Sequence, residues 1–292
     1  MSRIRITRAG PLTTLQDAGR PGWLAQGVSA SGPMDRGGFE RAGVWLGGAG
    51  STGIEFTSGV AFEVEAGTLA MAADGGGFGL EVNGKAMAWP ARVVLRAGDT
   101  VEVRSGAWGN WGYLRFGCEV EVEPVLGSRS TNSVAGLGKA LAVGDTVAFG
   151  AEAVRNMAPH PRPYEPSTGP IRVLWGLHAD LFDPAVRQRF AAEPFRVSAG
   201  MDRMGIRLDD PGGVFRGQRV LSLVSDAIVP GDIQILGDGT PIVLMRDHQP
   251  TGGYPRIATV VSVDLDRFAQ LRPGTEVRFE PVTLAHARGL KP

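Results

Sequence analysis

The densest group of residues able to do chemistry lies in one short segment, RDHQPTGGYPR, at residues 246–256. Asp247, His248 and Gln249 place a carboxylate, an imidazole and an amide at consecutive positions. A histidine titrates near neutral pH and can act as a general base, while an aspartate can orient it or bind a metal. The segment therefore predicts a site for proton transfer, although a turn with exposed polar residues has the same composition.

The same segment continues with a flexible bend and a cation. Gly252 and Gly253 allow the backbone to approach a small molecule closely, Tyr254 follows them, and Arg256 adds a positive charge. These residues favour a small-molecule site. The chain's other histidines have no partners at metal-ligand spacing, so we expect no metal site: His160, His178 and His286.

A second polar stretch, LGSRSTNS, spans residues 126–133. Ser128, Ser130 and Thr131 provide hydroxyls, and Arg129 provides a planar guanidinium that suits a carboxylate or a phosphate. This favours recognition of an anionic substrate group. Loops of this composition also satisfy their own backbone without binding anything.

Two further segments carry charges beside turns. In MDRMGIRL (201–208), Arg203 is a candidate for charge stabilisation, although the pattern favours a surface ion pair between Asp202 and an arginine. In SGPMD (31–35), Asp35 precedes a predicted helix whose first N–H groups could hold an anion, but the residue also suits a simple helix cap.

Two glycine-rich segments do not complete a nucleotide-binding motif. GLGK at 136–139 would need Gly at position 133, which is Ser, and Ser or Thr at position 140, which is Ala. GGGFG at 75–79 does not supply the G-x-G-x-x-G pattern of dinucleotide-binding folds. No phosphate-binding loop is therefore expected in this chain.

The composition excludes several classes of protein. Thirty basic and thirty acidic side chains give a net charge of zero, which predicts neither a nucleic-acid nor a membrane-surface partner. The first ten residues lack the apolar core of a secretory signal. A single cysteine, Cys118, excludes intramolecular disulfides and is expected to serve packing. We expect a cytoplasmic protein.

The elements that must position these residues are mainly strands. Gly and Pro make up about 22% of the 292 residues, against roughly 12% in average proteins. Alternating runs bounded by turn residues predict strands at 3–7, 60–65, 101–105 and 277–282. Helices are predicted at 34–46, at 183–190 with Asp183 as cap, and at 264–271 with Asp264 as cap.

One proline-rich segment predicts the domain boundary. Residues 156–170 hold five prolines in fifteen positions, which favours an extended linker. We therefore predict an N-terminal β-barrel domain over 1–155 and a C-terminal one over 171–292.

Several segments together resemble a known family. They occur in order between about residues 3 and 283: TLQDAGRPGW, SGPMD, LGSRST, DRMGIRL, DGTPIVLMRD, TGGYPRIATVVSVDL and AQLRPG. The chain resembles the allophanate hydrolase subunit 2 family, also called the biotin-dependent carboxyltransferase A/B-domain family. Asp17 and Arg20 join the candidate substrate-binding residues because they lie in the first of these segments.

The resemblance implies a fold, partners and cofactors. The fold is mainly β, with two cyclophilin-like β-barrel domains and a few short helices. The partners would be an allophanate hydrolase subunit 1-type protein, similar to the B component of 5-oxoprolinase, and a third protein similar to the A component of that enzyme. ATP and Mg²⁺ would act in the assembled complex.

Three functions remain open on the sequence alone. The first is a subunit of an ATP-dependent 5-oxoprolinase, which opens 5-oxoproline to L-glutamate. The second is a biotin-dependent carboxyltransferase of the urea amidolyase or allophanate hydrolase type, and the third is a non-catalytic regulatory binding subunit. For the enzyme, Arg129, Arg203 and Arg256 are candidates for charge stabilisation, and Asp247 and His248 for proton transfer.

Overall fold

The computed structural model describes residues 1–48, 50–151, 168–217 and 223–290. The chain divides into two compact units, one formed by residues 1–21 and 30–165 and the other by 22–29 and 166–292. Most of the predicted linker at 156–170 lies outside the described residues. The predicted boundaries 1–155 and 171–292 therefore stay predictions.

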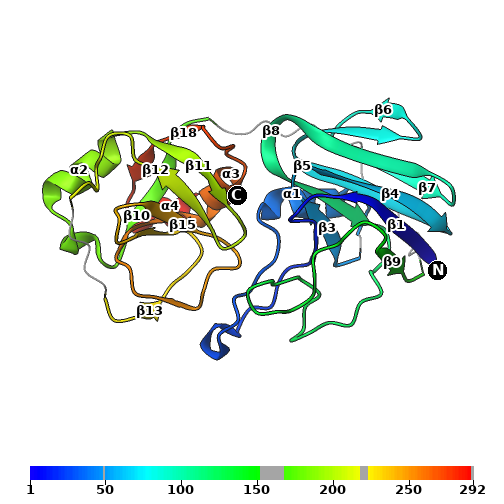
Figure 1. Cartoon of the computed structure of the whole chain (residues 1–292), viewed down its shortest axis with the longest axis horizontal. Coiled ribbons are helices and arrows are strands. Elements are labelled where there is room, and N and C mark those ends of the chain that lie inside the picture. The colour runs from blue at the N-terminus through cyan, green and yellow to red at the C-terminus, as the bar shows by residue number, and fades with distance from the viewer. Residues whose placement is uncertain (49, 152–167, 218–222, 291–292) are drawn as a thin grey trace. The chain divides into compact units, whose positions relative to one another are not determined.

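The first unit is built on one curved sheet in the order β2-β3-β8-β4-β1-β9, with β5 also paired to β8 and carrying β6 and β7 (Figure 1). The long strand β8 pairs with β4 near its start and with β3 near its end, while β5 runs beside it. This bends the sheet into a half-barrel. The strands are β1 (Ser2–Ala9), β2 (Thr14–Gln16), β3 (Gly53–Phe56), β4 (Gly59–Ala66), β5 (Thr68–Val82), β6 (Lys85–Met87), β7 (Ala91–Arg96), β8 (Thr100–Phe116) and β9 (Thr146–Phe149).

The concave side of this sheet is filled by apolar side chains. Alternate residues of β4 and β8 point inward, among them Phe62 and Phe116, which pack edge to face at 6.5 Å. Gly112 on β8 is required because a Cβ there would lie 2.4 Å from the Phe56 ring. The core therefore depends on close approach between β3 and β8.

The second unit has an eight-stranded sheet in the order β18-β11-β12-β15-β14-β17-β10-β19. Its two edge strands, β18 and β19, are separated in sequence by Arg278 alone, so the sheet nearly closes into a barrel. The strands are β10 (Ile171–Trp175), β11 (Phe195–Met201), β12 (Gly205–Asp209), β14 (Asp232–Ile235), β15 (Pro241–Leu244), β17 (Arg256–Val260), β18 (Glu276–Val277) and β19 (Phe279–Pro281).

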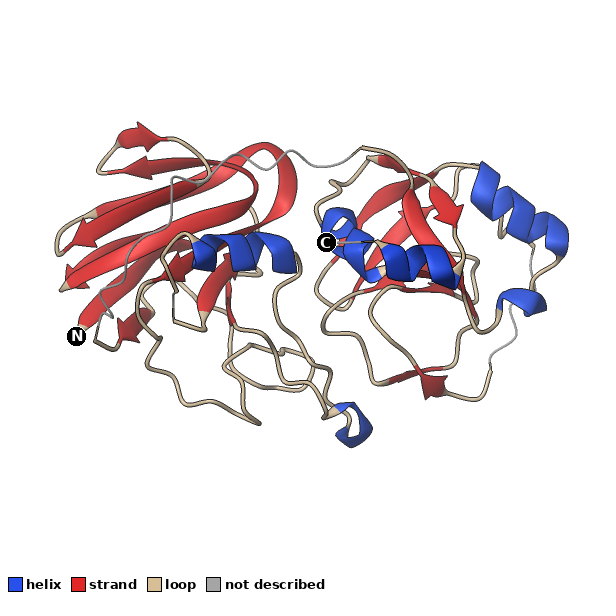
Figure 2. Cartoon of the chain, turned by 180° about the vertical axis from the view of Figure 1, so that it is seen from behind, coloured by secondary structure: helices blue, strands red, loops and turns tan. Residues whose placement is uncertain are grey.

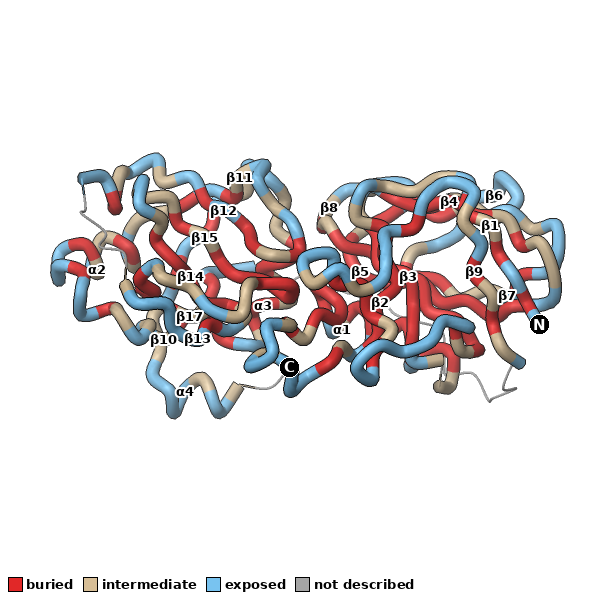
Figure 3. The backbone as a smooth tube through the Cα atoms, turned by 60° about the horizontal axis from the view of Figure 1, so that its bottom comes forward, coloured by how far each residue is buried: buried red, intermediate tan, exposed pale blue. Residues whose placement is uncertain are grey.

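A separate two-stranded ribbon joins β13 (Asp226–Ala227) to β16 (Thr251–Gly252). Figure 2 shows how few helices accompany the strands, and Figure 3 shows that the buried segments follow the strands of each sheet. The helices are the short 3-10 turns η1 (Leu24–Gln26) and η2 (Ala179–Leu181), with α1 (Arg36–Val44), α2 (Pro184–Ala192), α3 (Ser262–Ala269) and α4 (Leu284–Gly289). Among the described helices, none combines the length and apolar character needed to span a membrane.

The predicted fold class is confirmed: the protein is mainly β, with two barrel-like domains, one a half-barrel and the other nearly closed. The predicted strands at 3–7, 60–65 and 101–105 lie in β1, β4 and β8. The predicted strand at 277–282 is divided at Arg278, because the chain leaves β11's edge there and pairs next with β10.

Two of the three predicted helices have an aspartate cap as expected, although the first begins at Arg36 rather than at residue 34. Asp35 and Asp183 cap α1 and α2, accepting hydrogen bonds from Gly38 and Ala185 backbone N–H groups at 2.8 Å. The predicted cap at Asp264 is wrong. The α3 helix begins at Ser262, and the Asp264 carboxylate instead accepts three hydrogen bonds from Arg172 at 2.5–2.9 Å.

The aromatic core of the second unit yields a stability prediction. Phe190 on α2 is fully buried and packs against Phe195, Phe215 and Phe279 at ring distances of 5.6, 6.3 and 5.1 Å. We expect Phe190→Ala to lower the free energy of unfolding by about 3–5 kcal/mol, because a large cavity remains. Urea denaturation of the full chain measures this loss.

The matched control is Leu181→Ala, since that side chain is 64% exposed. Its effect should stay within about 0.5 kcal/mol. Equal losses for the two variants would contradict the packing of Phe190 in this core.

Candidate functional site

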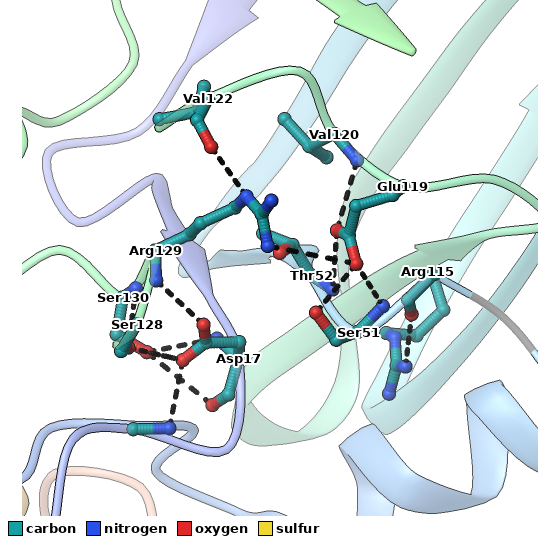
Figure 4. A network of polar contacts seen from close by, with 12 residues as sticks. Asp17, Ser51, Thr52, Arg115, Glu119, Val120, Val122, Ser128, Arg129 and Ser130 are labelled. Carbon is teal, nitrogen blue, oxygen red and sulfur yellow. Dashed lines mark hydrogen bonds and ion pairs between the residues drawn. The ribbon is translucent and has the colours of Figure 1, made fainter. Parts of the chain in front are cut away.

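In the first unit, the Asp17 carboxylate joins two loops that are far apart in sequence (Figure 4). Its Oδ1 accepts hydrogen bonds from the Ser128 and Ser130 hydroxyls at 2.5 and 2.7 Å and from the Gly19 backbone at 2.8 Å. Its Oδ2 accepts one from the Arg129 backbone at 2.7 Å. The sequence singles out four of these five residues, and the structure brings them together.

The Asp17 carboxylate is held as an anion. Burial alone would raise its pKa, but the hydrogen bonds from Ser128, Ser130 and two backbone N–H groups outweigh this and lower the pKa. Four donors already occupy its oxygens, so it is a poor general base. Ser128 and Ser130 also accept backbone hydrogen bonds within these loops, at 3.0 and 2.9 Å. Their role in substrate binding stays a prediction.

The two arginines of these loops differ in what they contact. Arg20 is 2% exposed and donates to the backbone carbonyls of Val125, Ser128 and Ser130, which fixes the loop shape. Arg129 is only partly buried: its Nε donates to the Val122 carbonyl at 2.5 Å, and its Nη1 lies 3.9 Å from Glu119.

Thr131 and Asp35 make other contacts. The Thr131 hydroxyl donates to the Lys139 carbonyl at 3.4 Å. The backbone N–H of Asp35 donates to the Tyr113 hydroxyl at 2.7 Å, and the neighbouring Met34 N–H donates to the buried Glu55 carboxylate at 2.7 Å. Asp35 therefore starts α1, and the structure adds Tyr113 and Glu55 to the groups that hold it.

The sequence patterns missed a second carboxylate–arginine region beside Arg129. Glu119 accepts hydrogen bonds from Ser51 and from the backbone N–H groups of Thr52 and Val120 (Figure 4). Burial opposes ionisation, but these donors lower its pKa to about 2. The available signal was a carboxylate three residues after the buried end of strand β8.

Arg115, near the end of β8, is the second group that the sequence patterns missed. It donates to the carbonyls of Phe39 and Gly50 at 3.1 and 2.6 Å, and its guanidinium lies 4.0 Å from the centre of the Phe39 ring. Burial lowers its pKa to about 10. Its position in the otherwise apolar run Tyr113–Phe116 was the signal for a buried cation.

In the second unit, Arg203 and Asp247 form a buried bidentate ion pair. The Arg203 Nε and Nη2 atoms lie 2.8 and 3.0 Å from the two Asp247 oxygens, and both side chains are at most 6% exposed. The Asp247 backbone N–H also donates to the Arg203 carbonyl at 2.7 Å. The two residues are 44 positions apart in the sequence, and the fold pairs them.

His248 lies next to this pair and is 3% exposed. Its Nδ1 donates to the Gln249 backbone carbonyl at 2.6 Å, which leaves the lone pair on Nε2. Burial lowers its pKa, although the charges of Asp232 and Asp247 act in the opposite direction. The imidazole is therefore neutral at physiological pH and able to accept a proton.

Arg256 belongs to a different group of charges. Its Nη2 lies 2.7 Å from Asp226, and its Nη1 donates to the Ala227 carbonyl at 2.6 Å and lies 3.4 Å from Asp232. This attaches the β13–β16 ribbon, which includes Gly252, to the barrel strands. Gly253 accepts a backbone hydrogen bond from Leu223 at 2.7 Å, and Tyr254 is 41% exposed.

A protein-family model covers most of this chain. The model of the carboxyltransferase domain, subdomain A and B, matches residues 26–281. The chain belongs to this family. The match includes both the Arg203–Asp247 pair and the Arg256 group, so these lie within the family's own fold.

Individual relatives of the carboxyltransferase family fall into two groups. The chain is 32% identical to the C subunit of the 5-oxoprolinase of Escherichia coli, over 97% of this chain and 93% of that protein. It is 29% identical to the urea amidolyase of Lachancea kluyveri, over 99% of this chain but 17% of that protein. The crystal structure of Kluyveromyces lactis urea carboxylase superposes with a TM-score of 0.87 at 26% identity, covering 98% of this chain and 28% of that one.

The low pKa of Glu119 predicts a pH dependence of stability. The folded-state pKa of about 2 lies below the ordinary value of 4.5, so the stabilisation is complete above pH 4.5 and is lost as the pH falls toward 2. A third of the side chain is exposed, and we expect solvent screening to limit the effect to about 1 kcal/mol. Denaturation of wild type and Glu119→Gln at pH 6 and pH 2.5 measures it.

The difference between these two proteins should shrink at the lower pH. Glu121→Gln is the matched control, because that carboxylate follows two residues later on the same segment. A difference that stays constant from pH 6 to pH 2.5 would contradict the role of the Glu119 charge.

The Arg203–Asp247 pair predicts a large and asymmetric loss of stability. We expect Asp247→Ala to cost about 3–5 kcal/mol, because it leaves a buried guanidinium without its carboxylate. The double variant Arg203→Met with Asp247→Leu should recover most of that loss, since it removes both charges together. Unfolding free energies of the two variants test this, and equal losses would show that packing, rather than charge, dominates the pair.

Proposed function

We propose that this chain is part of a heteromeric, ATP-dependent 5-oxoprolinase, which converts 5-oxoproline to L-glutamate. The observation that carries the proposal is the match to the C subunit of the Escherichia coli 5-oxoprolinase over nearly the full length of both chains. The second bacterial relative, from Haemophilus influenzae, has the same name and is covered over 91% of its length. In the urea enzymes, by contrast, the matching region is a small part of a much longer chain.

In this proposal the chain acts with an allophanate hydrolase subunit 1-type partner, similar to the B component of 5-oxoprolinase, and with a third protein similar to the A component. ATP and Mg²⁺ bind in that assembly. The GLGK segment of this chain does not fit a phosphate-binding loop, because it forms a turn without a following helix and Lys139 pairs with Asp145 at 2.8 Å. We therefore assign the nucleotide site to a partner.

The proposed contribution of this chain is to bind the lactam and to move a proton. His248 is the proposed general base, since its Nε2 lone pair is available and its imidazole is neutral. Asp247 and Arg203 position His248 through the adjacent backbone. Arg256 and Arg129 are the proposed groups for charge stabilisation. The net reaction consumes ATP and two waters and yields glutamate, ADP and phosphate.

A second candidate function is a carboxyltransferase that uses carboxybiotin. The structural match to urea carboxylase and the sequence match to urea amidolyase favour it. In that case biotin would arrive on a separate carrier protein. Loss of activity on addition of avidin, together with a requirement for bicarbonate, would identify this reaction and replace the first proposal.

The test is 5-oxoproline-dependent release of ADP by the complete assembly of this chain with its two partner proteins. We expect His248→Gln to lower kcat by about 10²–10⁴-fold, the usual contribution of a general base. Because the pKa of His248 is lowered from 6.5, the wild-type rate should begin to fall only below pH 6.5.

The matched control is His286→Gln, on the exposed helix α4, which should leave kcat unchanged. Absence of ADP release from the full assembly would overturn the proposed function. A His248→Gln variant with wild-type kcat would retain the function and remove His248 from the mechanism.

A further inference from the structure

Gln234 on β14 is an anomaly in the second unit. The residue is 1% exposed, and its amide Nε2 has no hydrogen-bond partner among the residues that the structure describes. Buried polar groups are almost always hydrogen-bonded, because burial without a partner is costly. The described residues of the chain therefore do not account for this buried, unpartnered amide.

A second unpartnered donor lies beside it. Arg256 on β17 is the register partner of Gln234, so the two residues are direct neighbours across the strands. The Nε of Arg256 is also buried and, in the described part of the chain, has no hydrogen-bond partner. Its other two nitrogens are occupied by Asp226, Ala227 and Asp232.

Both side chains lie under the same pair of ribbon residues. Asp226 of β13 and Gly252 of β16 are paired in register. The Arg256 guanidinium contacts Asp226 at 2.7 Å, and a Cβ on Gly252 would lie 2.2 Å from Gln234 Nε2. Only glycine fits over the amide. The Gln234 and Arg256 side chains therefore both lie against this one pair of ribbon residues.

The surrounding charge indicates what kind of acceptor fits. Arg256 faces two carboxylates, Asp226 and Asp232, so this group has a net negative charge. An incoming carboxylate or phosphate would be repelled, whereas a neutral carbonyl oxygen would not. Asp226 is also half-exposed, so solvent reaches the group formed by Arg256, Asp226 and Asp232 at this side chain. The Asp226 carboxylate can therefore accept a hydrogen bond from a ligand N–H.

We propose that Gln234 and Arg256 bind the carbonyl oxygen of a neutral amide group, of the lactam or urea type, while Asp226 accepts the N–H of that amide. The inference rests on the proposed function in one respect: the substrate of a 5-oxoprolinase carries such a lactam. It assigns recognition of the amide to these three residues, of which Gln234 and Asp226 were not singled out by the sequence.

The test compares the full chain with its Gln234→Met variant, which keeps the side-chain length and removes the amide. The probes are 2-pyrrolidinone, a neutral lactam, and acetate as the anionic control, with binding followed by NMR titration. Wild type should bind 2-pyrrolidinone saturably and acetate not at all. We expect the variant to bind the lactam at least about tenfold more weakly, the equivalent of one lost hydrogen bond to a buried site.

The melting temperature of the free protein supplies an independent readout. Because Gln234→Met removes an unpartnered buried donor, the ligand-free variant should melt at the same temperature as wild type or about 2 °C higher. A role in which the amide holds a buried structural water predicts the opposite, a lower melting temperature. The control Gln188→Met, on the exposed face of α2, should change neither binding nor melting.

Three results would overturn the inference: no saturable binding of 2-pyrrolidinone to wild type, equal binding to the Gln234→Met variant, or a lower melting temperature for that variant. Its failure is distinguishable from failure of the proposed function. If the assembly carrying Gln234→Met releases ADP with an unchanged KM for 5-oxoproline, the amide site is wrong and the enzyme stands. If the wild-type assembly is inactive while the lactam still binds through Gln234, the site stands and the 5-oxoprolinase proposal fails.

Discussion

A charge removed from water must be met by an opposite charge or by several hydrogen bonds, and this constraint shapes the loops of both units. In the first unit the Asp17 carboxylate accepts four hydrogen bonds and so joins its own loop to the loop at 126–131. In the second unit Arg203 and Asp247 join the turn after β11 to the turn after β15. Long connections between short strands would otherwise have little to fix them, since most of their residues are polar or glycine.

The same constraint explains why the two units treat arginine differently. Arg203 is matched by a carboxylate in bidentate geometry. Arg115 is matched by two backbone carbonyls and the Phe39 ring, and burial lowers its pKa to about 10. The first arrangement joins two turns of the second unit. The second only closes a helix against a strand, which is a structural task.

The sequence predicted the elements better than the contacts between them. Helices α1 and α2 were predictable because a single local feature, an aspartate accepting the first free N–H groups, starts each one. Asp264 has the same local signature, but Arg172 binds its carboxylate from a strand 92 positions away, so tertiary structure decided its role. Strands β1, β4 and β8 were predictable from alternation. The separation of β18 from β19 depends on closure of the barrel, which no local pattern reports. The candidate site shows the same limit: patterns located the polar loops around Asp17 and Asp247, but not that Ser128, Ser130 and Arg203 would occupy these carboxylates.

The contrast between Asp17 and Gln234 gives a physical criterion for separating structural from functional polar groups. A polar residue selected for the fold acquires partners during folding, as Asp17 does with four donors. A polar residue that stays buried beside an unpartnered neighbour is costly to the free protein, and natural chains retain such a cost where a ligand offsets it. By this criterion the Asp17 carboxylate holds the fold together. Strand β14 has the sequence DIQI, which is the composition of an ordinary buried strand. It is nevertheless the better candidate for a ligand-binding element.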